Sequence, residues 1–272
     1  MARFTSLLAP LLALALAGPA AAQPASGGAL PPVTISAQAN RDPVEKSYRK
    51  MLRGMELFER RSPQLAPGAT LRFKLLPRRR STDMSRIELD VIGSQTEFSV
   101  PVAPDHSFTL ARNAKALAEN AQVTPNRASG SMTWRTEIRT PGLPPGTRRL
   151  GDLRLECEVG MEAGLVSNSR TIVGQLANLL TDTPAYCRRE DQLYLFFAER
   201  PIFAVTLVAG ARREVLAIDR LYAAASDDAW LAADLPYCDC EVLLDRTYFL
   251  PLADARWPDD TLVQFEFMED AP

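Results

Sequence analysis

The sequence predicts a mainly β protein, built of antiparallel, β-sandwich-like units with an amphipathic helix near the N-terminus. Short runs that alternate apolar and polar residues begin at Thr70 and recur almost to the C-terminus. The chain holds 21 prolines, and Pro, Gly, Asp and Ser bound the runs, which favours short elements joined by turns. Strands and helices do not alternate regularly, so antiparallel sheets are expected rather than a parallel one.

The first 22 residues have the pattern of a secretory signal peptide. Arg3 precedes an apolar run at 7–17, and small residues at 20–22 complete a cleavage-site pattern. The run is too short for a membrane-spanning helix, which needs about 20 apolar residues. We therefore expect cleavage after Ala22, export to the periplasm and a mature chain without a transmembrane segment.

Residues 23–41 are rich in Ala, Pro, Gly and Gln, which predicts a flexible leader. A helix is then predicted from Asp42, a good N-cap residue followed by a proline at the first helical position, to Pro63, where it would end. Its apolar stripe consists of Val44, Tyr48, Met51, Leu52, Met55 and Phe58. We expect this stripe to pack against the core.

Beyond this helix, residue patterns predict strands with a few short helices. Strands are expected at 70–76, 85–92, 96–102, 106–111, 131–138, 152–160, 192–199, 202–209, 213–218, 240–245, 247–252 and 261–267. Helices are expected at 113–120, 169–180 and 226–234. We predict two units in sequence, 42–125 with the helix and 126–272 with all the cysteines; a single fused sandwich is the alternative.

The segment from 95 to 112 reads QTEFSVPVAPDHSFTLAR. It resembles the P-V-x-x-D-G-x-F-x-L hairpin of carboxypeptidase-regulatory-like, or transthyretin-like, β-sandwich domains, and the resemblance covers about residues 70–112. His106 stands where those domains usually have glycine. The resemblance implies a non-catalytic accessory module and no active-site residue. The remainder of the chain is similar to secreted proteobacterial proteins, which implies no chemistry.

Four cysteines, Cys157, Cys187, Cys238 and Cys240, predict two disulfides, because their number is even and the expected compartment is oxidising. Residues i and i+2 of a strand lie about 6.5–7 Å apart, at or beyond the usual Cα separation of a disulfide. We therefore expect Cys238 and Cys240 to bond one to Cys157 and the other to Cys187. The spacing does not fit a zinc site; Cu(I) binding by Cys238 and Cys240 is a less favoured alternative.

Common enzyme motifs are absent from the sequence. The single histidine, His106, is expected in an exposed turn, and no G-x-S-x-G, Walker A or G-x-G-x-x-G pattern occurs. The acidic pairs at 227–228 and 259–260 fit turns and caps better than catalytic carboxylates. The leading expectation is a protein without catalytic activity or cofactor. The alternative is a hydrolase of an envelope polymer that uses carboxylates the sequence does not identify.

Charge is unevenly distributed along the chain. Residues 41–86 carry 13 basic and 5 acidic side chains, whereas residues 187–272 carry 8 basic and 17 acidic ones. The densest basic point is Arg78, Arg79 and Arg80. This triplet is either an anion-binding face for an acidic envelope component or, as we favour, part of a basic region that packs against the acidic C-terminal region.

Export and a pI near 5.7 argue against nucleic acid as a partner. The sequence thus predicts a binding or structural module of the cell envelope, with an unspecified ligand.

Overall fold

The computed structural model describes residues 45–128, 130–165, 183–190, 193–222 and 242–270, which belong to the compact unit Ala37–Pro272. The predicted signal peptide, its cleavage site and the leader at 23–41 lie outside the described residues, as do the helices expected at 169–180 and 226–234.

Helices and antiparallel strands both contribute to the described chain. The α-helices are α1 (Tyr48–Leu65), α2 (Ala114–Ala118) and α3 (Leu150–Glu162), and the 3-10 helices include η1 (Pro184–Arg188), η2 (Ile218–Arg220), η4 (Leu244–Arg246) and η5 (Met268–Asp270). The strands are β1 (Lys46–Ser47), β2 (Thr70–Pro77), β3 (Leu89–Ile92), β4 (Glu97–Ser99), β5 (Ser107–Phe108), β6 (Gln122–Pro125), β7 (Met132–Arg139), β8 (Thr147–Arg149), β9 (Leu195–Phe197), β10 (Ile202–Ala209), β11 (Arg212–Val215), β12 (Thr247–Phe249) and β13 (Leu262–Phe267). The fold is therefore mixed α and β rather than mainly β, although its described sheets are antiparallel as predicted.

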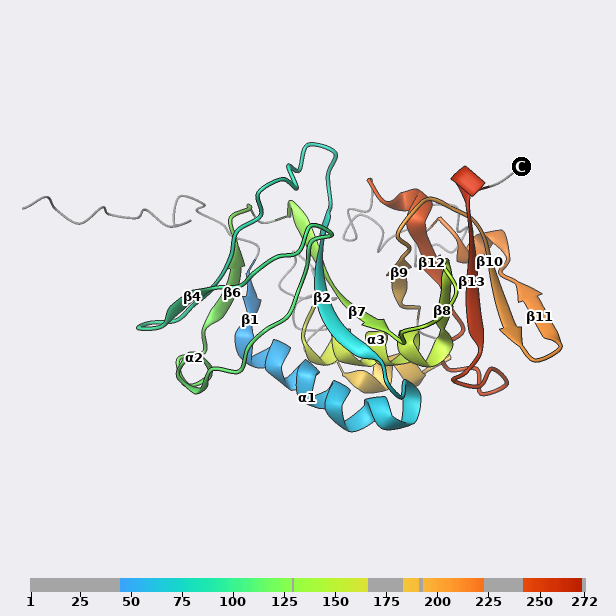
Figure 1. Cartoon of the computed structure of the whole chain (residues 1–272), viewed down its shortest axis with the longest axis horizontal. Coiled ribbons are helices and arrows are strands. Elements are labelled where there is room, and N and C mark those ends of the chain that lie inside the picture. The colour runs from blue at the N-terminus through green and yellow to red at the C-terminus, as the bar shows by residue number, and fades with distance from the viewer. Residues whose placement is uncertain (1–44, 129, 166–182, 191–192, 223–241, 271–272) are drawn as a thin grey trace, which may run out of the picture. The chain divides into compact units, whose positions relative to one another are not determined.

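The strands form sheets in the orders β1-β6-β3-β4, β5-β2-β7, β11-β10-β13-β8 and β12-β9 (Figure 1). The first two sheets and α1 enclose one core, which contains Tyr48, Phe73 and Trp134. The last two sheets and α3 enclose a second core, which contains Leu153 and Tyr248. Helices α1 and α3 run side by side, and a smaller apolar cluster lies between them (Figure 1).

Strand β7 pairs with β2 over their whole length, from Thr70 opposite Arg139 to Pro77 opposite Met132. This pairing joins segments that lie on either side of the predicted boundary between residues 125 and 126. The division into units at 42–125 and 126–272 stays a prediction.

Helix α1 begins later than predicted and passes through the proline that was expected to end it. Ser47 is the N-cap, and its hydroxyl accepts a hydrogen bond from the Lys50 N–H. The predicted start at Asp42 is wrong because residues 46–47 are extended and pair with β6. Pro63 lies in the last turn, where its missing N–H removes a single intrahelical hydrogen bond.

The predicted strand at 152–160 is wrong, since these residues belong to α3. Leu153, Leu155, Cys157 and Val159 alternate as in a strand, but α3 is buried on two opposite sides. Leu153 and Cys157 contact the second core, whereas Leu155 and Val159 contact the cluster beside α1. A helix that is buried on both sides has no polar face. The spacing of its apolar residues therefore cannot distinguish it from a buried strand.

His106 occupies the turn before β5 and is half-buried rather than fully exposed. Its φ of 62° lies in the left-handed region, which non-glycine residues rarely adopt. The ring is held by a contact of 3.0 Å between Nε2 and the carbonyl oxygen of Met84. The backbone at 106 thus has the conformation that favours glycine, the residue usual at this position in the resembled hairpin.

Candidate ligand-binding cavity

The cysteines do not pair as predicted. Cys157 of α3 and Cys187 of η1 form a disulfide with each other, with their Cα atoms 5.9 Å apart. Neither is therefore available to Cys238 or Cys240, which lie outside the described residues. The prediction failed because it placed Cys157 on a strand; on α3 its side chain faces the second core, where Cys187 also lies.

The arginine triplet does not form one exposed basic face. Arg78 is buried, and its backbone N–H donates to the carbonyl of Ser131 at 2.9 Å. Arg79 and Arg80 are exposed. As an anion-binding surface, the triplet therefore offers two solvent-facing side chains rather than three.

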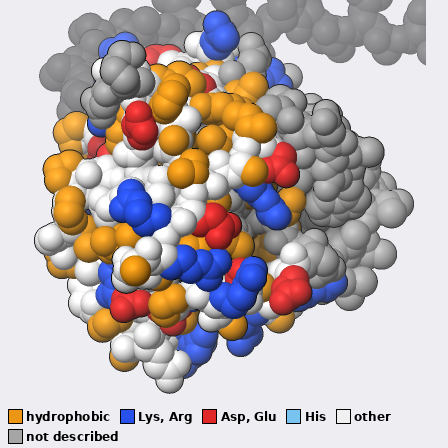
Figure 2. Space-filling view, turned by 90° about the vertical axis from the view of Figure 1, so that its right-hand side faces the viewer, with side chains coloured by type: hydrophobic (Ala, Val, Ile, Leu, Met, Phe, Trp, Pro, Cys, Tyr) orange, Lys and Arg blue, Asp and Glu red, His pale blue; other side chains and the backbone are white. Residues whose placement is uncertain are grey.

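Two arginines of the basic region pair with α3 instead of the acidic C-terminal region. Arg53 contacts Glu162 at 2.9 Å, and Arg61 contacts Glu158 at 3.2 Å. For these arginines the predicted partner segment is wrong. The face that carries β10, β11 and β13 shows basic side chains interspersed with acidic and hydrophobic ones (Figure 2).

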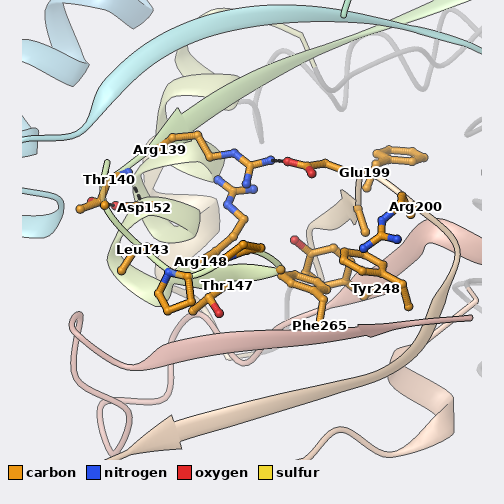
Figure 3. A pocket seen from close by; sticks show the side chains of 17 residues that line it. Arg139, Thr140, Leu143, Thr147, Arg148, Asp152, Glu199, Arg200, Tyr248 and Phe265 are labelled. Atoms are coloured by element: carbon orange, nitrogen blue, oxygen red, sulfur yellow. Dashed lines mark hydrogen bonds and ion pairs between the residues drawn. The ribbon is translucent and has the colours of Figure 1, made fainter. Parts of the chain in front are cut away.

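A cavity of about 300 Å³ lies where the loop at 140–146 meets β9, β12 and β13 (Figure 3). Its apolar wall is formed by Leu143, Pro144, Pro145, Phe197, Ala198, Phe265 and Phe267. Its polar wall is formed by Arg139, Thr140, Thr147, Arg148, Asp152, Glu199, Arg200 and Tyr248. The volume is at the lower end of the range for small-molecule sites, roughly 300–1,000 Å³.

Asp152 in the first turn of α3 fixes the loop that borders this cavity. One carboxylate oxygen accepts from the Thr140 N–H at 2.8 Å, and the other accepts from the Thr140 hydroxyl at 2.7 Å. At the other end of the loop, Gly146 has a φ of 65°. A Cβ at this position would lie 3.2 Å from the Phe265 carbonyl oxygen, so glycine allows the loop to pack closely on β13.

Arg148 and Glu156 form an ion pair of 2.6 Å at the inner end of the polar wall, with side chains that are 6% and 9% exposed. Both also bind β7: Arg148 donates to the Ile138 carbonyl at 2.6 Å, and Glu156 accepts from the Ile138 N–H at 3.1 Å. Within the described residues β7 is an edge strand. The pair therefore takes the place of a neighbouring strand at this position.

The inner polar wall contains two donors without a well-placed acceptor. Within the described part of the chain, the Tyr248 hydroxyl and Arg148 Nε are buried without a hydrogen-bond partner. Burial raises the pKa of the Tyr248 hydroxyl, and the charge of Arg148 only partly opposes this effect, so the hydroxyl keeps its proton at neutral pH. For Arg148, burial lowers the guanidinium pKa but the carboxylate of Glu156 outweighs it, and the net direction is upward.

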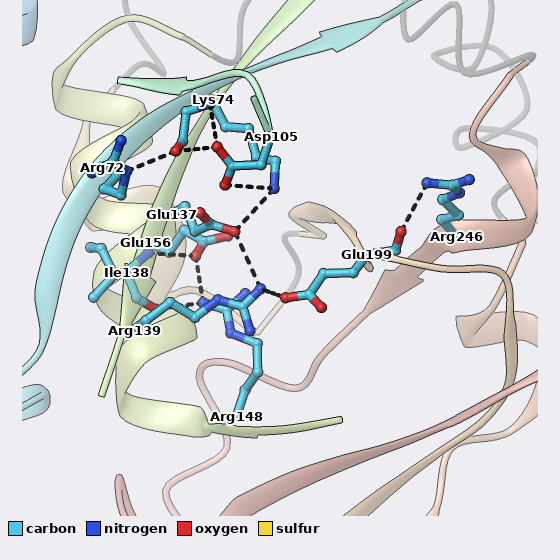
Figure 4. Close-up of polar contacts among 11 residues, drawn as sticks. Arg72, Lys74, Asp105, Glu137, Ile138, Arg139, Arg148, Glu156, Glu199 and Arg246 are labelled. Carbon is cyan, nitrogen blue, oxygen red and sulfur yellow. Dashed lines mark hydrogen bonds and ion pairs between the residues drawn. The ribbon is translucent and has the colours of Figure 1, made fainter. Parts of the chain in front are cut away.

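A chain of alternating charges leads from the β2–β7 sheet to the rim of the cavity (Figure 4). Lys74 contacts Glu137 at 3.4 Å, and Glu137 contacts Arg139 at 3.2 Å. Arg139 also pairs with Glu199, whose backbone carbonyl accepts from Arg246 at 2.9 Å. This network crosses from β7 to the segment after β9 and holds Arg139 beside the opening.

Of the acidic pairs considered for catalysis, one carboxylate has a structural contact and its neighbour Asp260 is exposed. Asp259 accepts a hydrogen bond from Arg154, and the pair at 227–228 lies outside the described residues. In the cavity wall, Asp152 binds Thr140 and Glu199 binds Arg139. No pair of carboxylates is directed at one point of this wall.

The described residues contain no cluster of three or more His, Cys, Asp or Glu side chains that fits a metal ion. Within the same residues, every helix is too short or too polar to span a bilayer.

Sequence reasoning missed the cavity because its wall comes from four separated segments, at 139–152, 197–200, 248 and 265–267. The stretch PGLPPGT at 141–147 predicts a turn, but nothing in it indicates that this turn borders a cavity.

No protein-family model, no curated protein and no solved structure matches this chain.

Proposed function

We propose that this protein is an exported, non-catalytic binding module of the cell envelope and that the cavity beside the loop at 140–146 is its ligand site. The observation that carries the proposal is the cavity itself, which has a volume of about 300 Å³ and an apolar wall as well as a polar one. Small-molecule sites are usually concave, largely apolar and provided with a few polar groups.

The state of the carboxylates favours binding over hydrolysis. A glycoside hydrolase needs two carboxyl groups that face one bond, with one available as an acid. In the wall of this cavity, Asp152 accepts two hydrogen bonds from Thr140, and Glu199 is paired with Arg139. Both carboxylates thus serve to hold the wall in place.

The periplasm is the proposed location, on two grounds. The N-terminal 22 residues have the signal-peptide pattern. The Cys157–Cys187 disulfide is consistent with an oxidising compartment.

A sandwich-like arrangement is the proposed form of the N-terminal region. Two antiparallel sheets on one core support it. We also propose that the likeness to carboxypeptidase-regulatory-like domains around 70–112 reflects the hairpin that leads through His106 into β5.

The test is extraction of small molecules from protein purified natively from envelope fractions, followed by mass spectrometry. Leu143→Trp fills the cavity from its apolar wall, whereas Val215→Trp adds the same bulk at an exposed position outside the cavity. We expect a compound that co-purifies with the native protein and with Val215→Trp but not with Leu143→Trp. Equal recovery from both variants, or no compound from any of the three proteins, refutes the proposal.

A further inference from the structure

We propose that the ligand of this cavity is an uncharged aromatic molecule of about two fused rings, which lies between Phe265 and Leu143. This inference rests on the proposed function and specifies its ligand class. It follows from three properties of the cavity: the paired state of its charges, the aromatic character of its accessible apolar surface and its volume.

The charged side chains of the wall already have partners inside the protein. The partners are Glu156 for Arg148, Glu199 for Arg139, Glu269 for Arg200 and Thr140 for Asp152. A ligand anion would have to displace one of these carboxylates, and a ligand cation would have to displace one of the arginines. Either exchange forms one ion pair at the loss of another, while the ligand still loses its hydration. An uncharged ligand avoids this cost.

The polar atoms at the inner end of the cavity do not contribute to its accessible surface. The Tyr248 hydroxyl and Arg148 Nε are covered by protein atoms, and the Tyr248 side chain is fully buried. These groups form the floor beneath the cavity. Contacts with the ligand therefore come from side chains nearer the opening.

The accessible apolar surface consists of aromatic rings on one side and of leucine and prolines on the other. Phe197 of β9 and Phe265 of β13 are both partly exposed. The loop contributes Leu143, which is partly exposed, and the exposed Pro144 and Pro145 (Figure 3). Aromatic pairs are more favourable than their buried area alone accounts for, so exposed phenylalanine rings favour a ring over an aliphatic chain of similar size.

The volume of the cavity sets the size of the ring system. An apolar cavity of about 150 Å³ in another protein holds one benzene molecule. The cavity described here has about 300 Å³, which is enough for two fused rings with a small polar substituent. It excludes larger polycyclic molecules and long acyl chains.

The experiment measures the binding of four probes by isothermal titration calorimetry, after any co-purified compound has been removed. Three are naphthalenes that carry a hydroxymethyl, a carboxylate or an aminomethyl group at the same carbon, and at neutral pH they are uncharged, anionic and cationic. The fourth is the hydroxymethyl compound with its rings saturated, a decalin. We expect the uncharged naphthalene to bind about tenfold more tightly than either charged one, and about three- to tenfold more tightly than the decalin.

Each comparison can overturn one part of the proposal. If the carboxylate or the ammonium compound binds as tightly as the hydroxymethyl compound, the argument from paired charges is wrong. If the decalin binds as tightly as the uncharged naphthalene, the argument from aromatic rings is wrong.

Phe265→Leu and Phe203→Leu are matched variants, because both replace a phenylalanine of the same sheet, but Phe203 is exposed and does not line the cavity. We expect Phe265→Leu to lose most of the preference for naphthalene over decalin, and Phe203→Leu to keep it. Melting temperatures show whether both variants are folded, and Phe197→Leu replaces Phe265→Leu if the latter does not fold. An equal preference in the cavity variant and in Phe203→Leu overturns the assignment of the aromatic wall.

The two proposals fail in different ways. If none of the four probes binds, but a co-purified compound is still lost from Leu143→Trp, the ligand class is wrong and the binding function stands. If the uncharged naphthalene binds Leu143→Trp as tightly as the native protein, binding occurs elsewhere and the site is wrong for both.

Discussion

The Arg148–Glu156 pair allows a sharp prediction about stability. Arg148→Met leaves the carboxylate of Glu156 buried without a counter-charge and removes the donor to the Ile138 carbonyl. Removing one partner of a buried ion pair costs about 3–5 kcal/mol. Glu156→Gln leaves the opposite charge unpaired but keeps an acceptor for the Ile138 N–H. We expect each single variant to be destabilised by an amount in this range.

The double variant distinguishes this account from simple loss of packing. Arg148→Met with Glu156→Gln contains no unpaired charge, and the remaining loss is the donor to the Ile138 carbonyl, at about 1–3 kcal/mol. The double variant should therefore be more stable than Arg148→Met alone. The assay is urea unfolding followed by tryptophan fluorescence, with the midpoint and slope fitted together. If the two single costs simply add, the pair is not coupled and the reasoning is refuted.

Three further predictions follow from the fold. Cys157→Ala with Cys187→Ala, which opens a loop with a sequence separation of 30, should cost about 3–4 kcal/mol in urea unfolding; an unchanged midpoint would contradict the stabilising role. Gly146→Ala and Gly142→Ala both place a side chain at positive φ, but only Gly146→Ala adds a close contact with the Phe265 carbonyl oxygen. Gly146→Ala should therefore lower the melting temperature more than Gly142→Ala. Equal decreases in melting temperature would show that the loop shifts to relieve the contact. Burial raises the pKa of Tyr194 to about 12 from 10.0, so folding disfavours its ionisation: the stability present below pH 10 should fall as pH rises from 10 towards 12. In Tyr194→Phe the melting temperature should decrease less between pH 10 and pH 12. An unchanged dependence of melting temperature on pH would show that Tyr194 does not cause the loss of stability.

The sequence was most informative where one side of an element faces a core. Strands β2, β7, β10 and β13 were predicted from alternation, because one of their faces is buried and the other is polar or partly exposed. In α1, the buried residues Tyr48, Met51 and Leu52 belong to the predicted stripe. Asn113 caps α2 within the predicted range, since its side chain accepts hydrogen bonds from two backbone N–H groups of the first turn.

Predictions from the sequence failed where an element is buried on both sides, or where contacts between distant segments determine the local structure. Helix α3 lacks a polar face, so its residues alternated like a strand. The strand predicted at 240–245 is also wrong in its described part, because 242–243 form a turn and 244–246 belong to η4. The cavity was not predictable at all: Arg148, Tyr248 and Phe265 are far apart in the sequence, and only the packing of β8, β12 and β13 brings them together.

The side chains that cover β7 have a consequence for solubility. A bare outer strand offers its amide and carbonyl groups to any extended segment of another molecule, which is a common route to aggregation. Here Asp152, Glu156 and Arg148 already occupy backbone groups at 138 and 140 with ionic side chains. The cluster thus satisfies the N–H and carbonyl of Ile138 and the N–H of Thr140 inside the protein, so these groups are not offered to an extended segment of another molecule.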